Sequence, residues 1–227
     1  MSNNVSSILE EIFNRPFDFE AKPMHPNHGQ AVEILIFPCC HNDDNEPMTL
    51  IAPSIKEGPW IAGGAALRWY QNQPVSESDI DIFCASEEQA NRLIEHIKSY
   101  GRYSTKYESD NAITLSYYSK EHNKEWTLQV IKRRYFRSLK EVIDNFDISV
   151  CQIGTGGNEW LLGNDTARDI RERNLRMYIP LQPDATKRLA KYWTYGYRPV
   201  KGLLSAVQTN PVAKKMFQSN EDYENAF

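Results

Sequence analysis

The sequence has no long apolar run, no cysteines at C-x-x-C spacing and no internal repeat. No apolar run approaches the roughly 18–20 residues that a helix needs to cross a bilayer. The segment before Pro16 has no basic region followed by an apolar core, which argues against a secretory signal. The four cysteines show no C-x-x-C spacing, so we expect reduced thiols. These absences predict a cytoplasmic protein without a membrane segment.

The composition is that of a globular chain, but the charge is unevenly distributed. Hydrophobic residues make up 41% of the 227 residues and charged residues 25%, which excludes a wholly disordered chain. The net charge is −4, yet residues 126–201 carry 14 Lys and Arg against 8 Asp and Glu. Such a basic segment in an acidic protein can mark a polyanion site, and a solvated basic face is the alternative.

The order of the expected elements indicates an α+β fold. Patterning predicts strands over 31–37, 48–55, 60–62, 79–85, 102–108, 112–118, 126–132 and 147–154. It predicts helices over 65–73, 86–100, 139–146, 165–174 and 184–197. We expect an N-terminal helix and arm over 1–30, an α+β domain over 31–160 and a helical C-terminal part with a polar tail over 161–227.

Two features close together could bind a metal and a triphosphate. Asp79 and Asp81 alternate with apolar residues, so on a strand both carboxylates project from one face. Carboxylate oxygens are the ligands that Mg²⁺ prefers. Gly63 and Gly64 precede a helix, where backbone N–H groups can approach phosphate oxygens. Each feature alone is common in turns and exposed edges, whereas the two in this order are far more specific.

The segments IAGGAALRWY (61–70) and SDIDIF (78–83) together resemble the signature of the DNA polymerase beta-like nucleotidyltransferase superfamily. Two looser similarities are to the head domains of tRNA CCA-adding enzymes and bacterial poly(A) polymerases. They lie in DISVCQIG (147–154) and DATKRLAKYWTYGYRP (184–199). The resemblance implies a nucleotidyltransferase-like mixed sheet with flanking helices, followed by a small helical C-terminal part.

The same resemblance implies roles for individual residues. Asp79 and Asp81 would ligate Mg²⁺ (or Mn²⁺), and Gly63 and Gly64 would cradle the triphosphate. Arg68 lies near a basic position of the family, displaced by one residue, and is expected to assist nucleotide binding.

One position departs from the family pattern. Many members carry a third carboxylate on a later strand, where this sequence has Gln129. Either Asp147, which would lie near the ribose of the nucleotide, supplies the third acid, or two carboxylates suffice, or the enzyme is impaired. We favour Asp147; its alternative role is to cap a turn where a strand begins.

Basic and aromatic residues supply further candidates for contacts with nucleotide or RNA. Arg133 follows a predicted strand, and its guanidinium could pair with phosphate or simply be solvated. A later helix carries Lys187, Arg188, Lys191 and Tyr192. Cations beside aromatic rings can hold single-stranded nucleic acid, although aromatic residues at helical spacing are more often core.

These features predict an Mg²⁺-dependent nucleotidyltransferase that passes a nucleoside monophosphate from an NTP to a hydroxyl group. An RNA 3′ end is the favoured acceptor; a small molecule or a protein side chain is the alternative. The chain lacks the long helical body with which CCA-adding enzymes grip tRNA, which suggests a need for a partner protein. The alternative function is that of a catalytically inactive nucleotidyltransferase fold that binds nucleotide or RNA or has a structural or regulatory role.

Overall fold

The computed structural model of the chain describes residues 33–36, 46–75, 78–100, 103–119, 123–157, 159–178 and 185–209. These residues divide into two compact units. Residues 33–146 and 150–166 form the larger unit, and residues 147–149 and 167–209 form the smaller one. The predicted N-terminal helix and arm and most of the polar tail lie outside the described residues.

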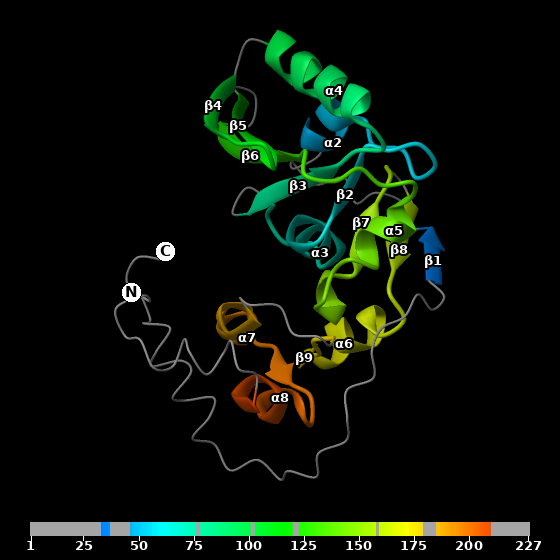
Figure 1. Cartoon of the computed structure of the whole chain (residues 1–227), viewed down its shortest axis with the longest axis vertical. Helices are drawn as coiled ribbons and strands as arrows, with labels where there is room; N and C mark the ends of the chain where they lie inside the picture. Colours follow the sequence, from blue (N-terminus) through cyan, green and yellow to red (C-terminus); the bar gives the residue numbers. More distant parts are fainter. Residues whose placement is uncertain are drawn as a thin grey trace. The chain divides into compact units, whose positions relative to one another are not determined.

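The larger unit is built on one mixed sheet, shown in Figure 1. Its described strands follow the order β1-β8-β7-β2-β3-β6-β5-β4. Strands β3 and β6 pair in parallel, and the other neighbours pair antiparallel. The strands are β1 (Glu33–Ile36), β2 (Trp60–Ala62), β3 (Asp79–Phe83), β4 (Tyr103–Glu108), β5 (Ala112–Ser119), β6 (Lys124–Ile131), β7 (Ile153–Thr155) and β8 (Glu159–Leu162). The predicted α+β class and mixed sheet are therefore confirmed.

Four helices of the larger unit flank this sheet. They are α2 (Glu46–Ile51), α3 (Gly64–Tyr70), α4 (Glu87–Ser99) and α5 (Leu139–Ile143). Helix α4 begins as its sequence predicts, because the Ser86 side chain accepts a hydrogen bond from the Gln89 N–H. Its apolar stripe of Ala90, Leu93, Ile94 and Ile97 is buried.

The two faces of the sheet are covered differently. One face carries Ile80 and Ile82 of β3 with Leu128 and Val130 of β6, and packs in one core with residues of α2 and α4. On the opposite face Trp60, Ala62 and Phe83 pack against α5. Farther along that second face, over β3, β6 and β5, the side chains become polar. Because side chains alternate along a strand, Asp79 and Asp81 project from this polar face.

Two sequence predictions about single elements were wrong. Residues 48–55 were predicted as a strand, but α2 begins at Glu46, and its Leu50 and Ile51 are buried in the core with α4. Pro47 fits the first turn of a helix because no intrahelical hydrogen bond is needed there. Residues 147–154 were predicted as one strand, yet a 3₁₀ turn over Ser149–Cys151 interrupts them and only β7 pairs in the large sheet.

The smaller unit is mainly helical. Its described elements are most of α6 (Thr166–Glu172), β9 (Asn174–Leu175), α7 (Ala185–Thr194), β10 (Arg198–Pro199) and α8 (Leu203–Thr209). Strands β9 and β10 pair in parallel. Ile148 bridges Met177, and the Tyr178 N–H donates to the Asp147 carbonyl at 2.7 Å. This short ladder ties residues 147–149 into the smaller unit.

None of the helices in the described ranges is both long and apolar enough to cross a membrane.

Candidate functional site

The Gly63-Gly64 turn lies beside the start of the acidic strand. Strand β2 pairs antiparallel with β3, with Ile61 opposite Ile82. The chain therefore leaves β2 level with the first half of β3. A Cβ added to Gly64 would lie 3.7 Å from Ser78 Oγ, the residue before Asp79. The structure thus brings together the two halves of the sequence motif within the larger unit.

Gly63 occupies a backbone conformation that suits glycine alone. Its φ is 79° and its ψ is −137°. A Cβ at this position would lie 2.9 Å from Cε1 of Phe146. The Gly63 N–H donates to the Ile153 carbonyl of β7 at 2.9 Å, and its carbonyl accepts from the Leu67 N–H of α3. Both the N–H and the carbonyl of Gly63 therefore fix the turn, and neither is available to a ligand.

The two acids lie in polar rows that run across three strands. Asp81 pairs in register with Gln129 of β6, and Gln129 in turn pairs with Thr114 of β5. Asp79 pairs in register with Thr127. The Asp79 side chain is exposed and that of Asp81 is half-buried. Register partners project from the same face, so both carboxylates border neutral hydrogen-bonding groups.

A lysine reaches over this polar face from the edge strand β4. Lys106 Nζ lies 3.3 Å from Thr127 Oγ1 and 3.0 Å from Glu125 Oε1. The Ser116 hydroxyl donates to Glu125. This hydrogen bond, together with Lys106, lowers the pKa of the Glu125 carboxyl below its ordinary value. The positive charge of Lys106 is therefore shared with a carboxylate already present on the face.

Asp79 and Asp81 provide a donor set that fits Mg²⁺ in part. Two carboxylates at positions i and i+2 of a rigid strand offer hard oxygen ligands, and Mg²⁺ in proteins often takes one or two carboxylates plus substrate phosphates. Within the described ranges no three His, Cys, Asp or Glu residues cluster as a complete metal site. These two residues could hold a cation if the remaining ligands came from a nucleotide and water.

Two of the basic candidates in the larger unit have different surroundings. Arg68 donates from Nη1 to the Pro74 carbonyl at 3.2 Å, which ties α3 to the segment leading into β3. Arg133 follows β6, and its own N–H donates to the Asn111 carbonyl. The flanking Lys132 and Arg134 pair with Glu108 and Glu141. The side chain of Arg133 is exposed between these two ion pairs.

The remaining candidates lie in the smaller unit. Asp147 is 9% exposed and forms an ion pair with Arg188 of α7. Tyr192 is buried, with its ring 5.8 Å from that of Tyr195 and 5.9 Å from that of Tyr197. Lys191 is exposed and Lys187 is half-buried. The structure thus joins Asp147 to Arg188 and places Tyr192 within the core of this unit.

A family comparison decides what the chain is related to. The model of the Gabija anti-defense 2 (Gad2) family matches residues 36–173. The chain belongs to the Gad2 family. The matched region contains the Gly63-Gly64 turn, both acids of β3 and Asp147. A search of curated proteins found no match.

Solved structures show which fold this Gad2 family chain adopts. A CCA-adding enzyme in complex with ATP is similar with a TM-score of 0.53 and 12% identity, over 73% of this chain and 41% of that one. An apo form of a CCA-adding enzyme gives a TM-score of 0.51 and 11% identity, over 70% and 39% of the two chains. The chain spans about two fifths of the length of these enzymes. At this identity the likeness establishes a nucleotidyltransferase-like fold.

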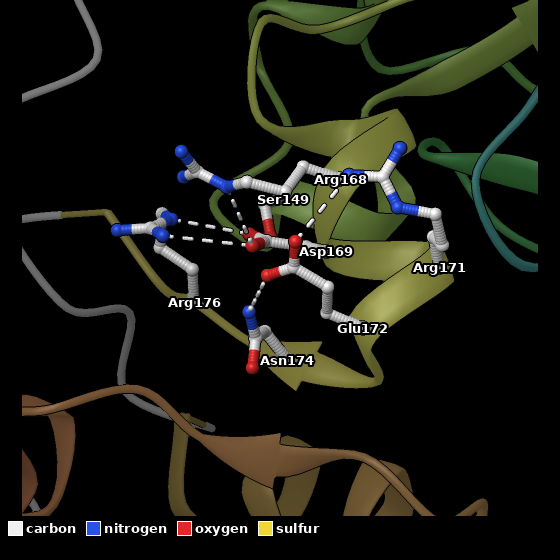
Figure 2. A network of polar contacts seen from close by, with 7 residues as sticks. All are labelled: Ser149, Arg168, Asp169, Arg171, Glu172, Asn174 and Arg176. Carbon is white, nitrogen blue, oxygen red and sulfur yellow. Dashed lines mark hydrogen bonds and ion pairs between the residues drawn. The ribbon is translucent and has the colours of Figure 1, made fainter.

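Sequence analysis missed a buried carboxylate in this Gad2 family chain. Asp169 of α6 is fully buried and accepts hydrogen bonds from Ser149 Oγ at 2.6 Å and from Arg176 Nε at 3.1 Å. Figure 2 shows these side chains converging on Asp169. Arg168 Nε also lies 3.8 Å from Asp169 Oδ1. An acid among several arginines between 168 and 176 was the available signal. Its role is structural, because it joins residues 147–149 to α6 and the chain after β9.

Cys84, which directly follows β3, is no nucleophile for this site. The residue is fully buried, and that burial raises the pKa of its thiol to about 12. The thiol therefore stays protonated near neutral pH.

Proposed function

We propose that the chain is an Mg²⁺-dependent nucleotidyltransferase. One observation carries the proposal: the Gly63-Gly64 turn lies beside the start of β3, where Asp79 and Asp81 project from the polar face of the sheet. An acceptor oxygen attacks the α-phosphorus of an NTP and forms a new P–O bond. The bond from that phosphorus to the bridging oxygen breaks, pyrophosphate leaves, and the proton of the acceptor hydroxyl passes to solvent. Most of the catalytic contribution comes from positioning and charge neutralisation.

In this proposal Asp79 and Asp81 hold Mg²⁺ (or Mn²⁺) together with the triphosphate. The cation supplies neutralisation of the charge that develops on the phosphate oxygens. Gly64 and the residues after it offer N–H groups to the phosphates, and Gly63 holds the turn open for them. The CCA-adding enzyme solved with ATP has a similar fold, which supports an NTP as ligand.

The other basic candidates would act at longer range. Arg68 would assist nucleotide binding indirectly, because it stabilises the segment that leads into β3. Arg133 would offer an exposed guanidinium to phosphate. In the smaller unit, Asp147 stays a candidate catalytic acid, and Lys187, Arg188, Lys191 and Tyr192 stay candidates for contacts with nucleotide or RNA. The sequence resemblance supports the assignments of Arg68 and Asp147, and the pattern of charged and aromatic residues supports the others; all are part of the proposal.

We propose an RNA 3′ hydroxyl as the acceptor, on the charge of the smaller unit. Its described residues include nine Lys and Arg but only three Asp and Glu. Two of the three acids, Asp147 and Asp169, are buried and ion-paired. The described part of this unit is therefore basic, which favours a polyanion. A partner protein could extend the grip on the acceptor, and we place the reaction in the cytoplasm, where NTPs are abundant.

The family description suggests the purpose of the reaction. Members are named for activity against the Gabija defence. We propose that nucleotidyl transfer by this chain counteracts that defence. Variants Asp79→Asn and Asp81→Asn should then no longer counteract Gabija in cells that carry this defence, whereas the exposed control Glu88→Gln on α4 should still do so.

One observation favours a second candidate function. Gln129, a neutral residue, stands in register with Asp81. If the site cannot support catalysis, the chain would bind nucleotide or RNA without transferring it. Retention of two neighbouring carboxylates speaks against this alternative, because like charges at one place are unfavourable without a cation.

The test is transfer of label from each α-labelled NTP in the presence of Mg²⁺ or Mn²⁺ and total RNA. We expect labelled RNA with the wild-type chain and none with Asp79→Asn/Asp81→Asn. Label on protein would keep the reaction class and change the acceptor. Absence of transfer, with NTP-dependent thermal stabilisation that the double variant loses, would establish the binding function instead. Absence of both signals would overturn the proposal.

A further inference from the structure

The polar row that contains Asp81 runs across three neighbouring strands. Asp81, Gln129 and Thr114 are register partners on β3, β6 and β5. Gln129 Nε2 donates to Thr114 Oγ1 at 3.2 Å, which anchors the amide within the row. The residue beside Asp81 is therefore held in place and carries no charge.

The neighbouring row is neutral next to its acid as well. Asp79 stands beside Thr127, and the Thr127 hydroxyl is in contact with Lys106 Nζ. Among the described residues, the β6 register partners of Asp79 and Asp81 are thus neutral, and the next acid along that face of β6, Glu125, is paired with Lys106.

Two charges on one strand are enough for one divalent cation but not for two. A pair of cations at the roughly 3.5–4 Å spacing of two-metal sites repel each other strongly and need additional anionic ligands. An NTP supplies several anionic oxygens to a single cation, which Mg²⁺ uses together with one or two carboxylates. We propose that Gln129 limits this site to a single divalent cation that enters together with the nucleotide.

In the structure, Asp147 is already paired and so does not offer the additional anionic ligand that a second cation would need. Its carboxylate is buried in the smaller unit and ion-paired with Arg188. To bind a cation it would have to give up this pair and leave a guanidinium half-buried, which is unfavourable. A role of Asp147 as a third ligand would therefore require this ion pair to open, and that role stays a prediction.

This inference rests on the proposed function, because it assumes that Asp79 and Asp81 bind a cation with an NTP. Its test counts Mn²⁺ by electron paramagnetic resonance, with and without a non-hydrolysable α,β-methylene NTP analogue. We expect one Mn²⁺ per wild-type chain with the analogue, and at least tenfold weaker binding without it. Gln129→Glu should bind Mn²⁺ at least tenfold more tightly in the absence of nucleotide.

The matched control is Gln129→Met, which has a similar length and no charge. It should keep the wild-type stoichiometry and affinity for Mn²⁺. Circular dichroism shows whether Gln129→Glu folds. If it does not, the Mn²⁺ affinity of Gln129→Asp and the number of Mn²⁺ ions bound by the wild type still test the inference. Two Mn²⁺ on the wild-type chain with the analogue, or unchanged Mn²⁺ affinity in the folded acidic variant, would overturn the inference.

Failure of the underlying function gives a different result. In that case the analogue and Mn²⁺ would bind equally poorly to the wild type and to Asp79→Asn/Asp81→Asn. That result would reject the nucleotide site as a whole. If the wild type binds two Mn²⁺ with the analogue and the double variant binds none, only the limit set by Gln129 is rejected.

Discussion

Gly63 decides the geometry of the turn that faces the acidic strand. Its φ is positive, and an added Cβ would lie only 2.9 Å from the ring of Phe146, which leaves no room for a side chain. We expect Gly63→Ala to lower the free energy of unfolding by about 2 kcal/mol, from backbone strain and the displaced ring. Urea denaturation followed by circular dichroism measures this loss.

Gly64 is the control for that substitution. Its nearest neighbour for an added Cβ is Ser78 Oγ at 3.7 Å, an ordinary contact, and it is the first residue of α3. Alanine is the better helix former by up to about 1 kcal/mol, so Gly64→Ala should be neutral or slightly stabilising. Equal losses for the two variants would contradict the assigned strain at Gly63.

The ion pair between Asp147 and Arg188 is expected to stabilise the smaller unit as a pair. Arg188→Met leaves a carboxylate that is 9% exposed without its guanidinium, and should cost roughly 3 kcal/mol. Asp147→Asn in the same chain should restore part of that loss. A double-mutant cycle by chemical denaturation measures the coupling. Strictly additive effects would show that the two side chains do not interact.

The start of helix α5 depends on a carboxylate and hence on pH. Glu141 accepts a hydrogen bond from the Arg137 N–H at 2.8 Å, and this bond, with Arg134 beside it, lowers the pKa of the Glu141 carboxyl. Because the folded pKa is depressed, the stabilisation is present above the unfolded value of 4.5 and is lost as pH falls through the folded value.

We therefore expect Glu141→Gln to flatten the acid side of the stability curve. The melting temperature of the variant should fall less than that of the wild type between about pH 6 and about pH 3. Above that interval the variant should be the less stable of the two. Thermal melts at several pH values give both results, and parallel curves for the two proteins would count against this role of Glu141.

Strands and helices with a clear period could be predicted from the sequence. Strands β3, β5 and β6 follow their alternating patterns, and the buried stripe of α4 matches its 3.6-residue period. Helix α2 was mistaken for a strand because a short apolar run fits both states, and packing against α4 decides between them. No local pattern shows that residues 147–149 pair with a segment almost thirty residues later.

The candidate site divides in the same way. The Gly63-Gly64 turn and the two acids are close in sequence, so their proximity in the structure could be predicted from the sequence, while their role as a site stays a prediction. The register that places Gln129 beside Asp81, and the reach of Lys106 to Thr127, depend on strand pairing between distant segments. The burial of Tyr192 and the ion pair of Asp147 likewise arise only when the smaller unit packs.

The described residues of the two units differ in charge, and we expect this difference to govern RNA binding. The smaller unit carries the basic surface, including Arg171 and Lys191, whose side chains are exposed. Charge reversal at both positions should weaken binding of a labelled single-stranded RNA. It should also make the slope of log K against log salt concentration shallower by about 0.7 per lost phosphate contact. Fluorescence anisotropy across a salt series measures the slope.

Lys56 is the matched control, since it is exposed and lies in the larger unit. Lys56→Glu changes the net charge by the same amount per residue, and should leave the RNA affinity and its salt slope almost unchanged. If Lys56→Glu weakens binding as much as either reversal in the smaller unit, RNA binds through overall charge and the smaller unit has no special part in it.

The most direct measurement of the central claim identifies the group that leaves the NTP. A γ-labelled NTP is incubated with Mg²⁺, RNA and the chain, and the labelled product is separated. Nucleotidyl transfer predicts labelled pyrophosphate, formed by the wild type and absent with Asp79→Asn/Asp81→Asn. Labelled orthophosphate, or pyrophosphate formed equally by the double variant, would contradict a nucleotidyltransferase centred on Asp79 and Asp81.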